Sequence, residues 1–177
     1  MVRVYVPATL AMLQQLVAEG SLRPVNGTAF AVTPTLREAY SDGDDEQLAD
    51  IALRDAALAS LRLIGADSGE TGGPGSEGLP ARRAVLEADV QEDVAGITLR
   101  PDLDDAVVRL AGEISLERVI AAYVDNPAAE SAVLAAVEVI DAADLGDEDA
   151  ELTVGDAQDH DLAWYAPQEL QFLLDLL

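Results

Sequence analysis

The sequence contains no cysteine and no lysine, and its only histidine is His160. Without cysteine, the chain forms no disulfides, thiol nucleophiles or zinc–thiolate centres. With one histidine, a histidine-rich metal site within one chain is excluded, and a Ser-His-Asp arrangement has only His160 to use. We therefore predict no cofactor and no dedicated metal site.

Long apolar runs are also missing. Nothing approaches the roughly 18 uninterrupted apolar residues that a membrane-spanning helix needs. The opening residues 1–13 place Arg3 before an apolar stretch, as a secretion signal would, but Tyr5, Pro7 and Thr9 interrupt it and no good cleavage site follows. We expect a cytoplasmic protein that does not bind membranes.

Positive charge is scarce and unevenly placed. The formal net charge is −24, all ten basic residues are arginine, and the last of them is Arg118. Fourteen carboxylates follow it, so residues 1–118 carry about −10 and residues 119–177 about −14. A field of this sign repels phosphate backbones, which argues against nucleic-acid binding. It suits a basic protein partner, and it also keeps a chain soluble as a monomer or weak homodimer.

Half of the 177 residues are apolar, which is enough for the core of a single domain over residues 1–177. Residues 67–80 are rich in Gly, Ser, Glu and Pro and predict a flexible loop, without the Gly-Lys-Ser/Thr ending of a phosphate loop. Residues 142–161 are acidic and weakly patterned, and we expect a second loop there. Its Asp-rich part lacks oxygen ligands at the positions that an EF-hand requires, which rejects a true EF-hand and leaves a loose, weak cation site in this loop as an alternative.

The longest predicted helix covers residues 44–64. Asp44 or Asp45 can cap its first turn, and its interior consists of Ala, Leu, Arg and Gln, which are strong helix formers. Gly65 stands where a left-handed C-terminal cap belongs. The apolar residues surround most of the helix, so we expect it to be covered on most sides.

Alternating apolar residues predict strands at several places along the chain. The expected strands are residues 2–6, 28–33, 83–90, 106–111 and 120–125, with a fragment at 97–99. Helices are expected at 10–19, with Thr9 and Gly20 as its caps, at 35–40 with a Thr35–Glu38 capping box, at 128–141, and from Pro167 to the end. The pattern favours an α+β fold with a mixed sheet of about five strands and helices mainly on one face. A doubly wound α/β fold is the alternative, because the opening strand–helix–strand unit allows a parallel crossover.

Two segments together carry a family resemblance. Arg-Val-Tyr-Val-Pro-Ala-Thr at residues 3–9, followed by a Leu-rich helix and Ala-Phe-Ala-Val-Thr-Pro at 29–34, is joined near the end by Leu-Ala-Trp-Tyr-Ala-Pro-Gln-Glu-Leu at 162–170. The chain resembles an uncharacterised family of actinobacterial proteins over nearly its whole length. The resemblance implies a high-GC source and a cytoplasmic setting, and it implies no activity.

One candidate binding surface follows from the alternation. If the Val and Leu faces of the strands pack on helices, Arg3, Tyr5, Arg83, Arg109 and Tyr123 point the other way. Three arginines and two tyrosines on one sheet face would suit an anionic or planar ligand. The alternatives are a solvated face on which Arg pairs with Glu87 and Asp89 across strands, or a face that helices cover.

The second candidate is His160, which lies between Asp159 and Asp161 and beside Trp164 and Tyr165. Flanking carboxylates stabilise a charged imidazole, and the aromatic pair could line a pocket, so a general acid–base role is conceivable. In the alternative interpretation, the two aromatic residues anchor the C-terminal segment to the core and His160 is exposed.

Three functions remain open. The favoured one is a non-catalytic protein-interaction or regulatory domain, because the chain has no catalytic motif and a strongly acidic C-terminal third; mimicry of nucleic acid is a minor version of it. An enzyme that uses His160 and nearby carboxylates, with or without a divalent metal, is the second. The third is a module that binds a small anion on the Arg/Tyr face.

Overall fold

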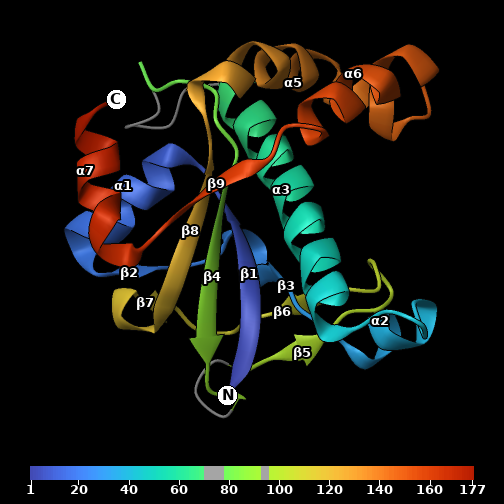
Figure 1. The fold of residues 1–177 in the computed structure, drawn as a ribbon, viewed down its shortest axis with the longest axis vertical. Helices are drawn as coiled ribbons and strands as arrows, with labels where there is room; N and C mark the ends of the chain where they lie inside the picture. Colours follow the sequence, from blue (N-terminus) through green and yellow to red (C-terminus); the bar gives the residue numbers. More distant parts are fainter. Residues whose placement is uncertain (70–77, 93–95) are drawn as a thin grey trace.

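The computed structural model describes residues 1–69, 78–92 and 96–177 (Figure 1). Its centre is a seven-stranded sheet in the order β5-β6-β3-β1-β4-β8-β9. The strands are β1 (Val2–Ala8), β3 (Thr28–Phe30), β4 (Ala84–Val90), β5 (Thr98–Leu99), β6 (Val107–Arg109), β8 (Val119–Asp125) and β9 (Leu162–Tyr165). A separate two-stranded ribbon joins β2 (Ser21–Leu22) to β7 (Ile114–Ser115).

The α+β class is confirmed, but the sheet differs from the expected one. It has seven strands instead of about five, and all its pairings are antiparallel rather than mixed. The doubly wound alternative is wrong, because β3 runs antiparallel to β1 with Tyr5 opposite Phe30. The chain turns just before β3, where Asn26 and Gly27 both adopt positive φ. A Cβ atom on Gly27 would lie 2.5 Å from the Leu110 carbonyl oxygen, so this turn requires glycine.

Helices cover both faces of the sheet, which corrects the expectation of helices mainly on one face (Figure 1). Helix α1 (Leu10–Glu19) and helix α7 (Leu170–Asp175) pack on one side, and α3 (Asp45–Gly69) packs on the other. The reason is visible in β4, where the neighbouring residues Val85 and Leu86 are both fully buried although they point to opposite faces. A strand that is apolar on both sides needs cover on both.

Helix α3 begins as predicted and ends later. The Asp44 carboxylate accepts a hydrogen bond from the Gln47 N–H, and the Gln47 side chain accepts one from the Asp44 N–H. The helix then continues through Gly65 to Gly69. A Cβ atom on Gly65 would lie 3.4 Å from the Ile140 side chain of α5 (Glu130–Asp144), an ordinary contact distance, so Gly65 faces α5 from within the helix and is not a cap.

The caps and ends of the smaller helices and strands were predicted correctly in some places and wrongly in others. Thr9 and Gly20 cap α1 as predicted. Helix α2 (Pro34–Ala39) is capped by Thr33, two residues before the expected Thr35. Strand β1 continues through Pro7, which had been expected to end it; β3 pairs with β1 only at Tyr5, so the proline lies where β1 has β4 as its single neighbour.

The acidic segment 142–161 is helical, which corrects the predicted loop. Helix α5 extends to Asp144, and α6 (Glu148–Gln158) follows after a short turn. The Asp147 side chain caps α6 by accepting a hydrogen bond from the Ala150 N–H, and the acidic residues of the first turn favour the helix N-terminus. The predicted loop at 67–80 falls largely outside the described residues, and its first three residues belong to α3.

Single turns of 3-10 helix complete the chain. They are η1 (Val25–Gly27), η2 (Leu116–Arg118), η3 (Pro127–Ala129) and η4 (Pro167–Glu169). The last two contain the prolines that were expected to start helices, and they lead directly into α5 and α7. Among the described residues, no helix combines the length and the apolar character that crossing a membrane requires.

A buried serine fastens α3 to the sheet. The Ser60 hydroxyl donates a hydrogen bond to the Ala8 carbonyl at 2.6 Å and accepts one from the Ala84 N–H at 2.9 Å. The side chain is fully buried, so neither backbone group has water as a substitute.

Replacing this serine tests the attachment. We expect Ser60→Ala to lower the free energy of unfolding by about 1–3 kcal/mol, because it leaves a buried carbonyl and a buried N–H unpaired. Urea denaturation measures the change, and Ser41→Ala, at an exposed position in the α2–α3 loop, is the control. Equal stability of the two variants would contradict this role of Ser60.

Candidate functional site

The structure divides the predicted Arg/Tyr face among three places. Arg3, Tyr5 and Tyr123 meet around Glu87 on the side of the sheet where α3 packs. Arg83 lies at the far end of β4, buried against β8 and α6. Arg109 lies on β6, where its guanidinium donates to the Asn26 carbonyl oxygen. The five side chains therefore do not form one ligand-binding surface.

The Glu87 cluster is saturated by its own members. Glu87 is 7% exposed, and its carboxylate accepts hydrogen bonds from Arg3 Nη1 at 3.0 Å, the Tyr123 hydroxyl at 3.1 Å and the Tyr5 hydroxyl at 3.4 Å. The Arg3 guanidinium also grips Asp89, with Nε 2.8 Å from Oδ1, and this hydrogen bond lowers the pKa of the Asp89 carboxyl. The pairs of Arg3 with Glu87 and Asp89 match the expected cross-strand ion pairs, but the face is partly covered by α3 and is not open to solvent as that alternative assumed.

Both tyrosines of this cluster are held in the neutral, hydrogen-donating form. Burial, reinforced by the charge of Glu87, raises the pKa of Tyr5 to about 12 and that of Tyr123 to about 12. Tyr5 also packs in the apolar cluster beneath α3. The arrangement neutralises a carboxylate inside the fold, and its donors are already used.

Arg83 is the most heavily bonded side chain in the interior. It is 1% exposed and forms a two-pronged ion pair with Asp125, in which Nε lies 2.9 Å from Oδ2 and Nη2 lies 2.7 Å from Oδ1. The Arg83 guanidinium also donates hydrogen bonds to the Gln158 side-chain oxygen at 2.7 Å and to the His160 carbonyl oxygen at 2.8 Å. Arg83 thus ties the ends of β4 and β8 to the end of α6 and to the segment that enters β9.

His160 lies half-buried beside this node, on the wall of a cavity of about 190 Å³. The lining residues come from α3, β4 and the α6–β9 connection: Asp50, Leu53, Arg54, Ala57, Arg83, Gln158, His160, Asp161 and Leu162. This volume is below the roughly 300–1,000 Å³ of sites that enclose small-molecule ligands. The lining holds an imidazole and carboxylates but no hydroxyl or amine nucleophile.

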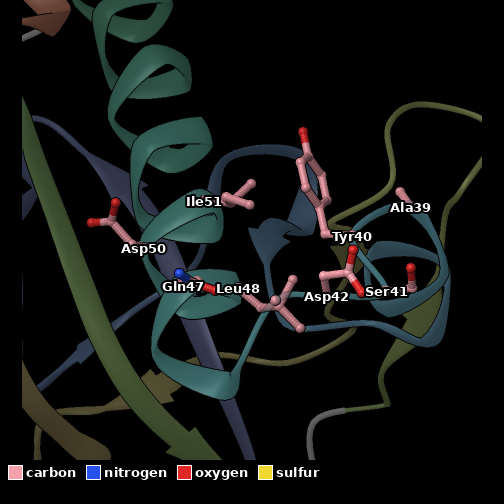
Figure 2. Close-up of a pocket in the computed structure, with 9 residues that line it drawn as sticks. Ala39, Tyr40, Ser41, Asp42, Gln47, Leu48, Asp50 and Ile51 are labelled. Carbon is pink, nitrogen blue, oxygen red and sulfur yellow. The ribbon is translucent and has the colours of Figure 1, made fainter.

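A larger hollow, of about 670 Å³, lies between the α2–α3 loop and the first turns of α3 (Figure 2). Leu48 and Ile51 form its apolar floor, and Tyr40 stands at its rim (Figure 2). Ser41 and Asp42 are exposed, and the Gln47 side chain is occupied with capping α3. The lining contains no basic residue, so the hollow has nothing to hold an anion.

The two aromatic residues near the C-terminus point to opposite sides of β9. Tyr165 packs against the core under α1 and α7, as an anchor would. Trp164 stands opposite Tyr123 in the β8–β9 ladder and is 57% exposed. The strand itself was missed, because its four residues are too few for an alternation signal.

Helix α5 matches the helix expected at 128–141, whereas α6 lies where a loop was expected. Together with their connection, the two helices form the acidic hairpin (residues 130–158). It contains nine carboxylates and no basic residue. Its inner side packs on α3 through a small apolar cluster that includes Leu61, Val133, Ile140 and Val154. Two exposed leucines lie near its tip, Leu145 at 90% and Leu152 at 69%. Within the described residues, no group of three or more His, Asp or Glu side chains is arranged to hold a metal ion.

Another group of acidic residues involves Asp55, which lies on α3. Asp55 is half-buried, and the carboxylates of Asp104 and Asp105 lie in the turn before β6. Burial, with the negative charges of Asp104 and Asp105, raises the pKa of Asp55 to about 6. The native state therefore binds a proton here that the unfolded chain releases at lower pH.

This shift gives a pH dependence of defined sign. Stability that the protonated Asp55 contributes is complete below pH about 4 and is lost as the pH rises through 6. Asp55→Asn mimics the protonated form, so we expect its urea midpoint to exceed that of the wild type at pH 7 and to approach it at pH 4. Asp50→Asn, at an exposed position on the same helix, is the control. An advantage of the same size at both pH values would contradict the account.

The Arg83–Asp125 pair predicts a second stability effect. Arg83→Met leaves the Asp125 carboxylate buried without a countercharge, and we expect a loss of about 3–5 kcal/mol in the free energy of unfolding. The double variant Arg83→Met, Asp125→Leu removes the stranded charge and is expected to recover a large part of that loss. A double variant less stable than Arg83→Met in urea denaturation would contradict this explanation.

Comparisons with known proteins place the chain in a family. No curated protein matches it, and no solved structure matches it. One family model matches residues 2–174, which is nearly the whole chain, and its description is a family of unknown function, DUF6912. The chain therefore belongs to the DUF6912 family, whose function is unknown.

Proposed function

We propose that this protein is a non-catalytic interaction domain of the cytosol that binds a basic protein partner through its acidic hairpin. The observation that carries the proposal is the lack of internal compensation for the hairpin's charge. Arginines pair with two of its nine carboxylates, namely Glu130 with Arg82 and Asp144 with Arg62. In the described part of the chain, the other seven have no arginine within ion-pair distance.

The rest of the molecule has little unpaired positive charge: among the described residues, Arg109 and Arg118 are the arginines without a carboxylate within ion-pair distance. Eight of the ten arginines pair with a carboxylate, and the two that hold the interior clusters, Arg3 and Arg83, are the most heavily engaged. The negative field of the hairpin therefore extends into solvent, where it accelerates encounters with a basic surface.

The exposed leucines supply apolar surface that a bound partner would bury. Leu145 and Leu152 lie among Asp147, Glu148 and Glu151, so charge would guide a partner to the surface and apolar contact would add affinity. This combination of central apolar residues and a charged rim is typical of protein–protein interfaces. Catalysis at His160 is less well supported, because its cavity is small, holds no hydroxyl or amine nucleophile, and has Arg83 in its wall already bonded to Asp125, Gln158 and the His160 carbonyl.

A capture experiment with matched variants tests the proposal. The hairpin variant carries Glu148→Gln, Asp149→Asn and Glu151→Gln, and the control variant removes three charges elsewhere, by Glu38→Gln, Asp42→Asn and Glu46→Gln. All six side chains are exposed; the hairpin variant removes acids from the first turn of α6, and the control removes acids from the end of α2, the α2–α3 loop and the first turn of α3. We expect a basic protein to be retained from a lysate of the source organism by the wild type and by the control, to be lost from the hairpin variant, and to be released by high salt.

Thermal unfolding of both variants provides the check that they remain folded. Equal retention by all three baits would contradict the proposal. Equal loss from both variants would also contradict it, because net charge and not the hairpin would then determine binding.

A further inference from the structure

Strand β9 is an open edge of the sheet. Among the described residues it pairs with β8 alone, so two of its four residues direct their N–H and C=O groups away from the sheet. The strand contains no charged residue and no proline. The opposite edge, β5, has only two residues and is followed at once by Arg100 and Pro101. Proteins often blunt an edge with a very short strand, a charged residue or a proline; β9 is longer than β5 and has no charge or proline within the strand, although Asp161 precedes it and Pro167 follows two residues after it.

A large aromatic side chain marks this edge. Trp164, 57% exposed, lies on the α3 side of the sheet next to Tyr123. Leu162 and Tyr165 are turned into the two apolar clusters, so they hold the strand in place. A strand added at this edge would set one of its side chains beside the Trp164 ring, and an Arg or Lys there would gain a cation–π contact.

The charges around β9 select the occupant. Asp159 and Asp161 precede the strand and Glu169 follows it, and all three are exposed. A second copy of this chain would bring the same carboxylates and a net charge of −24 to the same edge, which opposes pairing between copies. A basic segment in extended conformation would pair with the backbone edge of β9 and would complement the negative charge of the carboxylates around it.

We infer that β9 binds an extended, basic segment of a protein partner, which adds to the sheet as an eighth strand and places a cationic side chain over Trp164. The backbone edge supplies the hydrogen bonds and the tryptophan supplies the preference for a cation. This inference rests on the proposed function, because it states how the basic partner would be held.

Peptides of defined sequence provide the probe. The test peptide is an octamer that alternates Arg with Val, and the control peptide has every Val replaced by Pro, which keeps the charge but prevents strand pairing. Trp164 is the only tryptophan, so its emission reports directly on the site. We expect the Arg-Val peptide to shift that emission and to protect the amides of residues 162–165 from hydrogen exchange, and the Arg-Pro peptide to do neither.

Two protein variants complete the design. Trp164→Ala is expected to weaken binding of a labelled Arg-Val peptide about five- to tenfold, measured by fluorescence anisotropy. Phe172→Ala removes an aromatic side chain of similar exposure (72%) from α7 and is expected to bind as the wild type does. Both positions are exposed, so both variants are expected to fold.

Several outcomes would overturn the inference. Equal binding of the Arg-Val and Arg-Pro peptides would show attraction by charge alone, and unchanged binding by Trp164→Ala would place the peptide elsewhere. A dimer in sedimentation that Trp164→Ala abolishes would identify the occupant as a second copy. If the hairpin variant loses its partner while the peptide leaves the β9 amides unprotected, the inference fails and the proposed function stands. If the peptide protects β9 but capture of the partner does not depend on the hairpin, the proposed function fails.

Discussion

The buried guanidinium of Arg83 is the interaction on which the outer parts of this fold depend. One side chain, 1% exposed, bonds to the end of β8 through Asp125, to the end of α6 through Gln158 and to the carbonyl of His160. Desolvating a guanidinium is costly, and this site offsets the cost with a two-pronged carboxylate and two further acceptors. The node thereby positions both the acidic hairpin and the edge strand that follows it.

In the described part of the chain, the buried side-chain polar atoms have hydrogen-bond partners except Arg109 Nε, which favours the surface as the place for function. Glu87 takes its hydrogen bonds from Arg3 and two tyrosines, and Ser60 serves two backbone groups. By contrast, seven hairpin carboxylates lack an arginine partner in the described part of the chain, and the β9 backbone edge lies next to an exposed tryptophan. These hairpin carboxylates and the backbone N–H and C=O groups on the open side of β9 could both be paired by a partner. A basic segment in extended conformation would supply positive charge for the first and strand hydrogen bonds for the second.

Local signals in the sequence predicted where most helices and strands lie, but few of the contacts between them. The caps of α1 by Thr9 and Gly20 and the start of α3 at Asp44 depend on neighbouring residues, and these predictions were confirmed. Gly65 was misread as a cap because the helix continues past it, where it faces Ile140 of α5, a residue 75 positions away. The acidic helix α6 looked like a loop because its apolar residues are small and sparse, and β9 was missed because four residues carry no periodic signal.

The candidate site was harder to predict for the same reason. Arg3, Tyr5 and Tyr123 were assigned to one sheet face by alternation, and Glu87 and Asp89 were named as possible cross-strand partners of arginine, but that both tyrosines also donate to Glu87 follows only from the strand register. Arg83 was placed with them, although it lies at the buried end of the strand. Hydrogen exchange of Arg83→Lys, which keeps a charge for Asp125 but loses the planar fork, tests its role most directly. We predict faster exchange confined to residues 148–165, with β1 and α1 unchanged; uniform acceleration, or none, would contradict the central role of Arg83.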